Sequence, residues 1–97
     1  MAIRSFSDRA TEEFFKSGVL RKSTGWKSLR AIAARKLDML HYAASLLDLR
    51  SPPGNHLEKL KGNLREMHSI RINDQWRIIF CWTESGPADV RIIDYHK

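Results

Sequence analysis

The chain has 97 residues, of which 42% are hydrophobic and 29% are charged, a composition that predicts one globular domain over residues 1–97 and excludes a disordered or fibrous chain. Seventeen Lys and Arg against eleven Asp and Glu leave a net charge of +6, which favours a polyanionic partner such as nucleic acid or an acidic protein surface. No apolar stretch approaches the roughly twenty residues of a membrane span, and residues 1–5 lack the apolar segment of an export signal. We therefore expect a cytoplasmic protein without a membrane partner.

The first half of the chain predicts a strand and two helices. Apolar and polar side chains alternate over residues 2–6, which is typical of a short strand. Ser7 or Asp8 can cap a short helix that Gly18 ends, and apolar residues at three- and four-residue steps predict a longer helix over residues 26–47. We expect these helices to form an antiparallel hairpin that packs on one face of a sheet.

The second half predicts mainly strands. Two prolines and a glycine in residues 50–55 end the helical region. Residues 57–60 then form a short stretch that a second turn at residues 61–63 ends. The runs 67–72, 76–82 and 88–95 are joined by turns too short for parallel crossovers, so they predict a three-strand antiparallel meander. The fold class is therefore α+β. On the run 76–82, Ile78 and Phe80 share the core face, whereas Arg77 lies on the other face, which we expect to form a shallow surface suited to a polymer.

Positive charge is concentrated in the first half of the chain. No acidic residue lies between Glu13 and Asp38, whereas this stretch contains Lys16, Arg21, Lys22, Lys27, Arg30, Arg35 and Lys36. A solvated helix face is the simpler interpretation, and a docking surface for a phosphate-rich partner is the alternative. Trp26, before the long helix, is interpreted as a packing anchor.

Familiar local motifs are absent from the sequence. There is no glycine-rich nucleotide loop and no serine-hydrolase motif, and the four histidines are too scattered in sequence to suggest a metal site. We predict neither a metal nor another cofactor.

Residues that could cleave RNA occur near the end of the chain. Asp94-Tyr95-His96 directly follows an apolar strand, Arg77 belongs to a strand that should neighbour it, and Lys61 lies in an earlier turn. RNA cleavage needs a base for the 2′-hydroxyl, an acid for the leaving 5′-oxygen and cations for the phosphate. Histidine can serve as acid or base, and Arg or Lys can bind the phosphate. A polar tail without function is the alternative, because sequence spacing does not show whether these side chains converge.

Four segments of the sequence resemble HigB-type toxins of the RelE/ParE superfamily. They are residues 48–58, Leu60-Lys61-Gly62, residues 68–78 and the closing Asp94-Tyr95-His96, and the likeness as a whole runs from Ile3 to His96. The resemblance implies a RelE-like fold and the toxin of a type II toxin–antitoxin system.

The resemblance also implies an activity and its partners. The toxin would be a ribosome-dependent endoribonuclease that cuts translated mRNA in the ribosomal A site and so inhibits growth. A HigA-like helix-turn-helix antitoxin would silence it and link it indirectly to operator DNA. Lys61 and Arg77 would bind phosphate, with Arg71 as a further RNA-binding cation, and Asp94, Tyr95 and His96 would form the acid–base and positioning group. The cations Arg21, Lys22, Lys27, Arg30, Arg35 and Lys36 would dock on the ribosome or on the antitoxin.

The sequence departs from the family at one position. Some members have a histidine two residues before Leu-Lys-Gly, where this chain has Glu58, with His56 two residues earlier. Glu58 could take over proton transfer, His56 could replace the histidine, or the position could be dispensable. Two other functions also stay open, namely a ParE-like inhibitor of DNA gyrase and a non-catalytic ribosome- or RNA-binding module.

Overall fold

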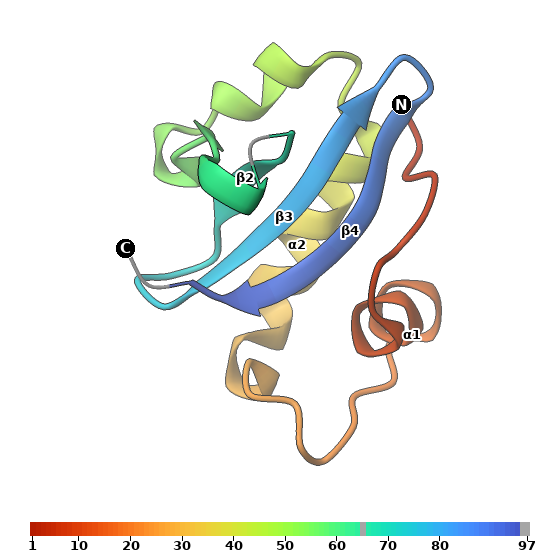
Figure 1. Cartoon of the computed structure of the whole chain (residues 1–97). Helices are drawn as coiled ribbons and strands as arrows, with labels where there is room; N and C mark the ends of the chain where they lie inside the picture. Colours follow the sequence, from red (N-terminus) through yellow and green to blue (C-terminus); the bar gives the residue numbers. More distant parts are fainter. Residues whose placement is uncertain (65, 96–97) are drawn as a thin grey trace.

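The computed structural model describes residues 1–64 and 66–95. In this part of the chain two α-helices, α1 (Arg9–Ser17) and α2 (Arg30–Tyr42), precede four strands, β1 (Glu58–Lys59), β2 (His68–Arg71), β3 (Trp76–Thr83) and β4 (Gly86–Asp94). The strands form one sheet in the order β1-β2-β3-β4, and all neighbouring strands are antiparallel. Figure 1 shows α2 behind β3 and β4. The predicted α+β class and the C-terminal meander are therefore confirmed.

Helix α1 begins and ends at the residues that the sequence indicates. The Asp8 carboxylate accepts a hydrogen bond from the Thr11 amide at 2.7 Å, which caps the first turn. Gly18 has a φ of +75° in the left-handed region, and its amide donates to the Phe14 carbonyl at 2.8 Å. Thr11 is fully buried, and its hydroxyl oxygen accepts from the Ile92 amide of β4 at 3.2 Å. This bond ties α1 to the edge of the sheet.

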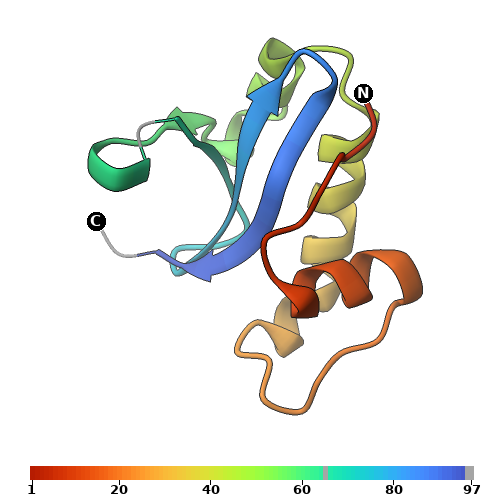
Figure 2. The ribbon, with the colours of Figure 1, turned by 45° about the vertical axis from the view of Figure 1, so that its right-hand side comes forward.

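The two helices do not form the expected antiparallel hairpin. Figure 2 shows α1 lying across the direction of α2, and Thr11 attaches α1 to β4. The second helix is also shorter than predicted. It ends at Tyr42, and a 3₁₀ helix over Leu46–Arg50 follows it. The Asp48 carboxylate accepts from the amides of Ala44 and Ser45 at 2.9 and 3.1 Å, so a new capped turn begins where the long helix was expected to continue.

The expected strand over residues 2–6 is reduced to a single parallel bridge between Phe6 and Val90. On either side of residues 89 and 90, Ile79 pairs with Arg91 and Cys81 pairs with Ala88, so β4 has one more residue than β3 there and bulges. Asp89 within this bulge has a positive φ of 54°. The N-terminal segment meets β4 at this bulge, where Phe6 bridges to Val90.

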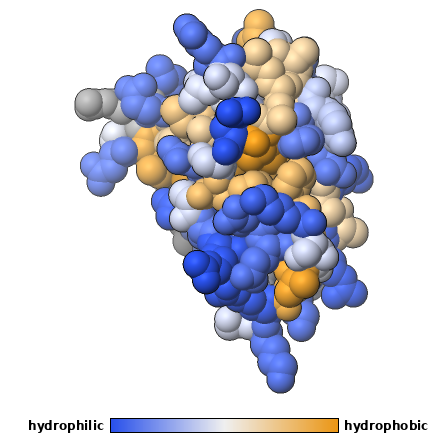
Figure 3. Space-filling view, turned by 90° about the vertical axis from the view of Figure 1, so that its right-hand side faces the viewer, coloured by the Kyte–Doolittle hydropathy of each residue, from blue (hydrophilic) through white to orange (hydrophobic). Residues whose placement is uncertain are grey.

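Figure 3 shows the surface on the side of the N-terminal segment and α1. The lower part of this surface is mostly hydrophilic, and its upper part contains more apolar residues. No helix in residues 1–64 and 66–95 is long and apolar enough to cross a membrane.

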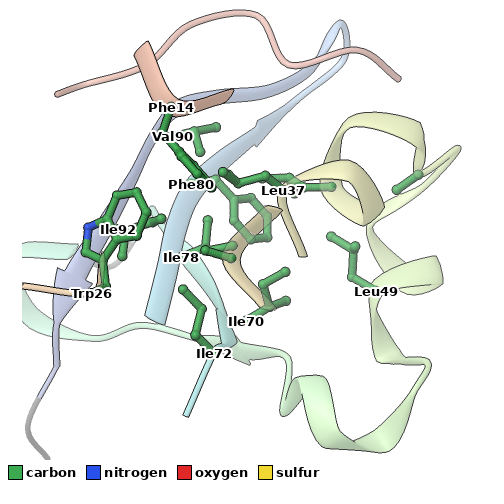
Figure 4. Packing of buried hydrophobic residues seen from close by; sticks show 13 residues of the cluster. Phe14, Trp26, Leu37, Leu49, Ile70, Ile72, Ile78, Phe80, Val90 and Ile92 are labelled. Carbon is green, nitrogen blue, oxygen red and sulfur yellow. The ribbon is translucent and has the colours of Figure 1, made fainter. Parts of the chain in front are cut away.

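The core lies between the helices and one face of the sheet. Ala33, Leu37 and Leu40 recur at helical spacing on α2 and are fully buried. They belong to one cluster with side chains of β2, β3 and β4, including Ile70, Ile78, Phe80, Val90 and Ile92 (Figure 4). Trp26 is 4% exposed and meets Phe14 edge to face at 5.0 Å, which confirms its role as a packing anchor. Because alternate strand residues face opposite sides, this core directs Arg77 to the other face of the sheet.

Candidate functional site

A hollow lies on the sheet face opposite the core. In the strand register, Ser69 pairs with Glu58 and with Ile79, and Arg71 pairs with Arg77, so polar side chains of β1, β2 and β3 share this face. The hollow has a volume of about 410 Å³ and is lined by His56, Glu58, Arg71, Asn73, Asp74, Arg77 and Tyr95. Side chains as far apart in the sequence as His56 and Tyr95 thus line the same hollow.

Arg77 forms the buried floor of this hollow. Its Nη1 donates to the His56 carbonyl at 3.1 Å and to the Ser69 hydroxyl at 2.7 Å, and its Nη2 donates to Glu58 Oε1 at 3.1 Å. The Arg77 side chain is 8% exposed, and its guanidinium lies 5.9 Å from the centre of the Tyr95 ring. These contacts from several segments fix the guanidinium in one orientation.

Arg71 provides a second and more accessible guanidinium. Its side chain is 35% exposed and forms an ion pair with Asp74 in the turn between β2 and β3. The side chain of Asp74 is 94% exposed. Solvent screens such an exposed pair, so Arg71 can exchange Asp74 for another anion at little cost.

The turn between β2 and β3 is tied to the end of β4. Asn73 Oδ1 accepts from the amides of Gln75 and Trp76 at 2.9 and 2.8 Å, which closes the turn. The Gln75 carbonyl accepts from the Tyr95 amide at 2.7 Å, and Gln75 Nε2 donates to Asp94 Oδ2 at 3.0 Å. Asp94 pairs with Trp76 in the sheet and does not line the hollow, whereas Tyr95 does.

The segment that supplies the His56 carbonyl is held in place by hydrogen bonds of the preceding residue, Asn55. Asn55 is fully buried, and its Nδ2 donates to the carbonyls of Leu49 and Ser51 at 3.1 and 3.3 Å. Lys36 on α2 donates to Asn55 Oδ1. A buried amide whose donors and acceptor are both bonded fixes the backbone around it, and here that backbone leads directly to His56.

Lys36 does not lie on the surface with the other predicted docking cations. It is 5% exposed, and burial lowers the pKa of its ammonium, as do the positive charges of Arg35 and Arg71. The structure therefore removes Lys36 from the predicted docking surface. The helical period that exposes Arg35 turns the next residue towards the core.

The remaining predicted docking cations are exposed. Lys22, Lys27, Arg30 and Arg35 are on the surface, and Arg21 lies there with its guanidinium against Glu13, Nη2 to Oε1 at 2.9 Å. The hydrogen bond from Arg21 lowers the pKa of Glu13. The Arg21 charge is thus offset locally.

Lys61 lies apart from the arginine hollow. It is exposed and lines a separate depression of about 380 Å³ together with Lys59, Leu60, Gly62 and Glu66. His96, the third member of the predicted acid–base group, falls outside the described residues. Of the predicted chemistry, the structure brings together Arg71, Arg77 and Tyr95.

Sequence reasoning did not identify the contributions of Ser69, Asn73 and Gln75. Strand parity offers a signal for Ser69. It lies two residues before Arg71 on β2, and Arg71 pairs with Arg77 of β3, so Ser69 is on the same face of the sheet as Arg77. Asn73 and Gln75 lie in the turn that the sequence predicts between the runs 67–72 and 76–82. Asn73 bonds within that turn, whereas the contact of Gln75 with Asp94 depends on the path of β4 past the turn. Glu58 and His56 both line the hollow, and Glu58 contacts Arg77 directly.

The hollow therefore combines two guanidinium groups, a carboxylate, an imidazole and a phenol. Guanidinium groups bind phosphate, and the other groups can accept or donate protons. Among the described residues, no group of three or more His, Cys, Asp or Glu side chains is arranged to hold a metal ion.

Comparisons with known proteins point to one family. A family model described as a RelE-like toxin of the type II toxin–antitoxin system HigB matches residues 4–96. Over 92 residues the chain is 39% identical to Toxin HigB-1 of Vibrio cholerae serotype O1, covering 95% of both chains. Over 70 residues it is 47% identical to an uncharacterized protein of Haemophilus influenzae, covering 72% of this chain and 68% of that one.

Proposed function

The chain belongs to the HigB-like family of RelE-like toxins of type II toxin–antitoxin systems, and from this membership we propose that it is a ribosome-dependent endoribonuclease that cleaves translated mRNA. A type II toxin has an antitoxin as its partner. Cleavage of mRNA during translation would stop protein synthesis and growth until that antitoxin binds.

The observation that supports the proposal is the convergence of Arg71, Arg77 and Tyr95 around one hollow of about 410 Å³. Tyr95 lies against the buried Arg77 guanidinium, which favours a functional role over a polar tail without function. In the proposed reaction the 2′-oxygen of the RNA attacks the adjacent phosphorus and the bond to the 5′-oxygen breaks. A base takes the 2′-proton, and an acid returns a proton to the 5′-oxygen.

We assign the groups that act in this reaction as follows. Arg71 contacts the phosphate from the accessible side of the hollow, and Arg77 stabilises the growing negative charge from its floor. Tyr95 and His96 are the proton-transfer candidates, and Asp94 positions them. Lys61, which lines a different depression, binds a phosphate beyond the cleaved bond.

The ribosome supplies what a small domain lacks. A shallow hollow on a 97-residue domain buries little of an RNA strand, so substrate alignment has to come from elsewhere. The exposed cations Lys22, Lys27, Arg30 and Arg35 are suited to docking on ribosomal RNA, with acidic residues of a HigA-like helix-turn-helix antitoxin as competitors. Through that antitoxin the toxin would reach operator DNA only indirectly.

The decisive experiment uses purified protein, ribosomes programmed with a defined mRNA, and mapping of the cut ends. We expect cleavage only on the ribosome, together with loss of cleavage in Arg71→Gln and in His96→Ala. Arg71 is preferable to Arg77 for this test, because its side chain is 35% exposed against 8% for Arg77, and its replacement leaves the buried contacts of Arg77 in place.

Two outcomes would contradict the proposal. Intact mRNA with arrested supercoiling by DNA gyrase would indicate the ParE-like mode. Co-sedimentation with ribosomes without any cut would indicate a non-catalytic ribosome-binding module.

A further inference from the structure

One residue in the turn between β2 and β3 holds two consecutive residues at the end of β4. The Gln75 carbonyl accepts from the Tyr95 amide at 2.7 Å, and the Gln75 side chain donates to the Asp94 carboxylate at 3.0 Å. Neither the family resemblance nor the sequence pattern assigns Gln75 a role. We propose that Gln75 is a positioning residue that, through Asp94, directs Tyr95 into the hollow, an inference that rests on the RNA-cleaving function proposed above.

Gln75 can serve as an anchor because its own turn is fixed. Asn73 Oδ1 accepts from the amides of Gln75 and Trp76 at 2.9 and 2.8 Å, and the amides of Ile72 and Asn73 donate to the Trp76 carbonyl at 2.9 and 3.2 Å. These bonds leave the backbone of the turn few alternatives. The side chain of Gln75 therefore starts from a defined position.

Tyr95 needs such an anchor because it lies beyond the sheet. The last ladder pair joins Trp76 to Asp94, and β4 ends there. Asp94 is exposed, and the bond from Gln75 restricts the rotamers that its side chain can adopt. The two bonds from Gln75 hold the backbone of Tyr95 and the carboxylate before it, and the Tyr95 ring then lies near the Arg77 guanidinium at 5.9 Å.

The amide of glutamine suits this task chemically. It donates a hydrogen bond to a carboxylate without adding a charge beside the RNA-binding cations, so the Arg71 and Arg77 sites keep their electrostatics. Asp94 on this reading acts on the tail that carries Tyr95, consistent with its absence from the lining of the hollow. A catalytic group displaced by about 1 Å can lose up to roughly a hundredfold in rate, so a modest loosening is measurable.

The test is steady-state cleavage of ribosome-bound mRNA by Gln75→Leu, Asp94→Ala and the double variant. Gln75→Leu keeps most of the side-chain volume and removes the donor. We expect kcat to fall about tenfold with KM within twofold of wild type, and the double variant to be no slower than Asp94→Ala, because both changes break the same contact.

Controls separate positioning from folding. Gln75 and Glu84 are both exposed turn residues, so Glu84→Leu introduces the same apolar side chain in the turn between β3 and β4 and should leave kcat and KM unchanged. A wild-type kcat in Gln75→Leu, or losses that multiply to about a hundredfold in the double variant, would overturn the inference.

A measurement independent of cleavage distinguishes failure of the inference from failure of the proposed function. Hydrogen exchange of the Tyr95 amide should be faster in Gln75→Leu than in the wild type, because the bond between Gln75 and Asp94, which helps to hold the tail, is lost. Unchanged exchange would overturn the positioning role even if the enzyme cuts RNA. An inactive wild type would overturn the proposed function and, with it, any catalytic consequence of Gln75.

Discussion

Glu58 occupies the position at which this chain departs from those family members that have a histidine. Its carboxylate contacts Arg77 at 3.1 Å, and the two side chains are 31% and 8% exposed. Burial strengthens this pair relative to a surface ion pair, and the carboxylate offsets part of the positive charge that a phosphate would meet. Glu58 therefore orders the floor of the hollow and at the same time lowers the positive charge available to the phosphate of the proposed RNA substrate.

We predict that Glu58→Gln binds RNA about fivefold more tightly, which corresponds to roughly 1 kcal/mol for one removed negative charge near the phosphate site. The amide can still accept from Arg77, so its orientation is retained. Fluorescence anisotropy with a 2′-O-methyl oligonucleotide, which cannot be cleaved, measures the affinity. Glu84→Gln makes the same charge change in a remote exposed turn, and equal tightening by both variants would contradict a local effect.

His68 makes the stability of the fold sensitive to acid. Its ring stacks on Phe80 at 6.2 Å between centroids, and Nδ1 is buried with no hydrogen-bond partner among the described residues. Burial lowers the pKa of His68 below its ordinary value of 6.5, and the positive charge of Lys59 lowers it further. The unfolded chain therefore takes up a proton at a higher pH than the folded chain does.

The contribution of His68 to stability is fully present above about pH 6.5 and is lost as the pH falls towards its lower folded-state pKa. We predict that the free energy of unfolding falls less for His68→Phe, which cannot titrate, than for the wild type between pH 7.5 and pH 5.5. Urea unfolding at the two pH values measures this difference. A difference between the two proteins that does not change with pH would contradict this role.

At the scale of elements, the N-terminal segment is held against the beginning of β4. The Arg4 amide donates to the Pro87 carbonyl at 2.7 Å, and the Ser7 amide donates to the Val90 carbonyl at 3.0 Å. Gly86, the first residue of β4, has a φ of +121°, and a Cβ there would lie 2.6 Å from the Ala2 carbonyl oxygen. The close approach of the segment therefore requires glycine at this position.

We predict that Gly86→Ala lowers the free energy of unfolding by about 2 kcal/mol, because it combines an unfavourable φ with a clash against backbone. Gly54→Ala is the matched control. A methyl group at residue 54 would have no atom within 4 Å, and the φ of Gly54 is not positive, so we expect a change within about 0.5 kcal/mol. Equal losses in urea unfolding would show that the N-terminal segment does not depend on Gly86.

At the scale of the whole molecule, the basic connection between α1 and α2 lies near the turn between β2 and β3. A Cβ added to Gly25, in the basic connection between α1 and α2, would lie 2.7 Å from the Trp76 ring. Trp76 in turn pairs with Asp94, and the next residue, Tyr95, lines the hollow. Figure 1 shows this connection and the turn between β2 and β3 at the same end of the molecule. A long polyanion could therefore contact both regions at once.

We predict that the double change Lys22→Gln and Lys27→Gln weakens ribosome binding and reduces its slope against log salt by about 1.5, because two phosphate contacts are lost. The double change Lys16→Gln and Arg21→Gln removes the same charge, but these cations already pair with Glu12 and Glu13. Their loss should affect the slope less. Equal slopes for the two double variants, measured by co-sedimentation at several salt concentrations, would contradict docking through Lys22 and Lys27.

Much of the architecture could be predicted from local sequence signals. The cap at Asp8, the stop at Gly18, the apolar stripe of α2 and the alternation along β3 each depend on residues within a few positions of one another. The end of α2 and the first strand were less predictable. The Asp48 carboxylate binds the Ala44 amide and starts a new turn after α2, and the N-terminal segment meets β4 only at a bulge.

The sequence by itself determined the α+β class, the meander, the core face of β3 and the family, because short-range periodicity and ordered motifs are properties of the linear chain. Tertiary structure alone decided that Lys36 is buried against Asn55, that Glu58 contacts Arg77, and that Gln75 holds the residues after β4. Periodicity indicates which face of an element a side chain occupies. It does not indicate which distant segment lies opposite that face, since this depends on strand register and on the path of the loops.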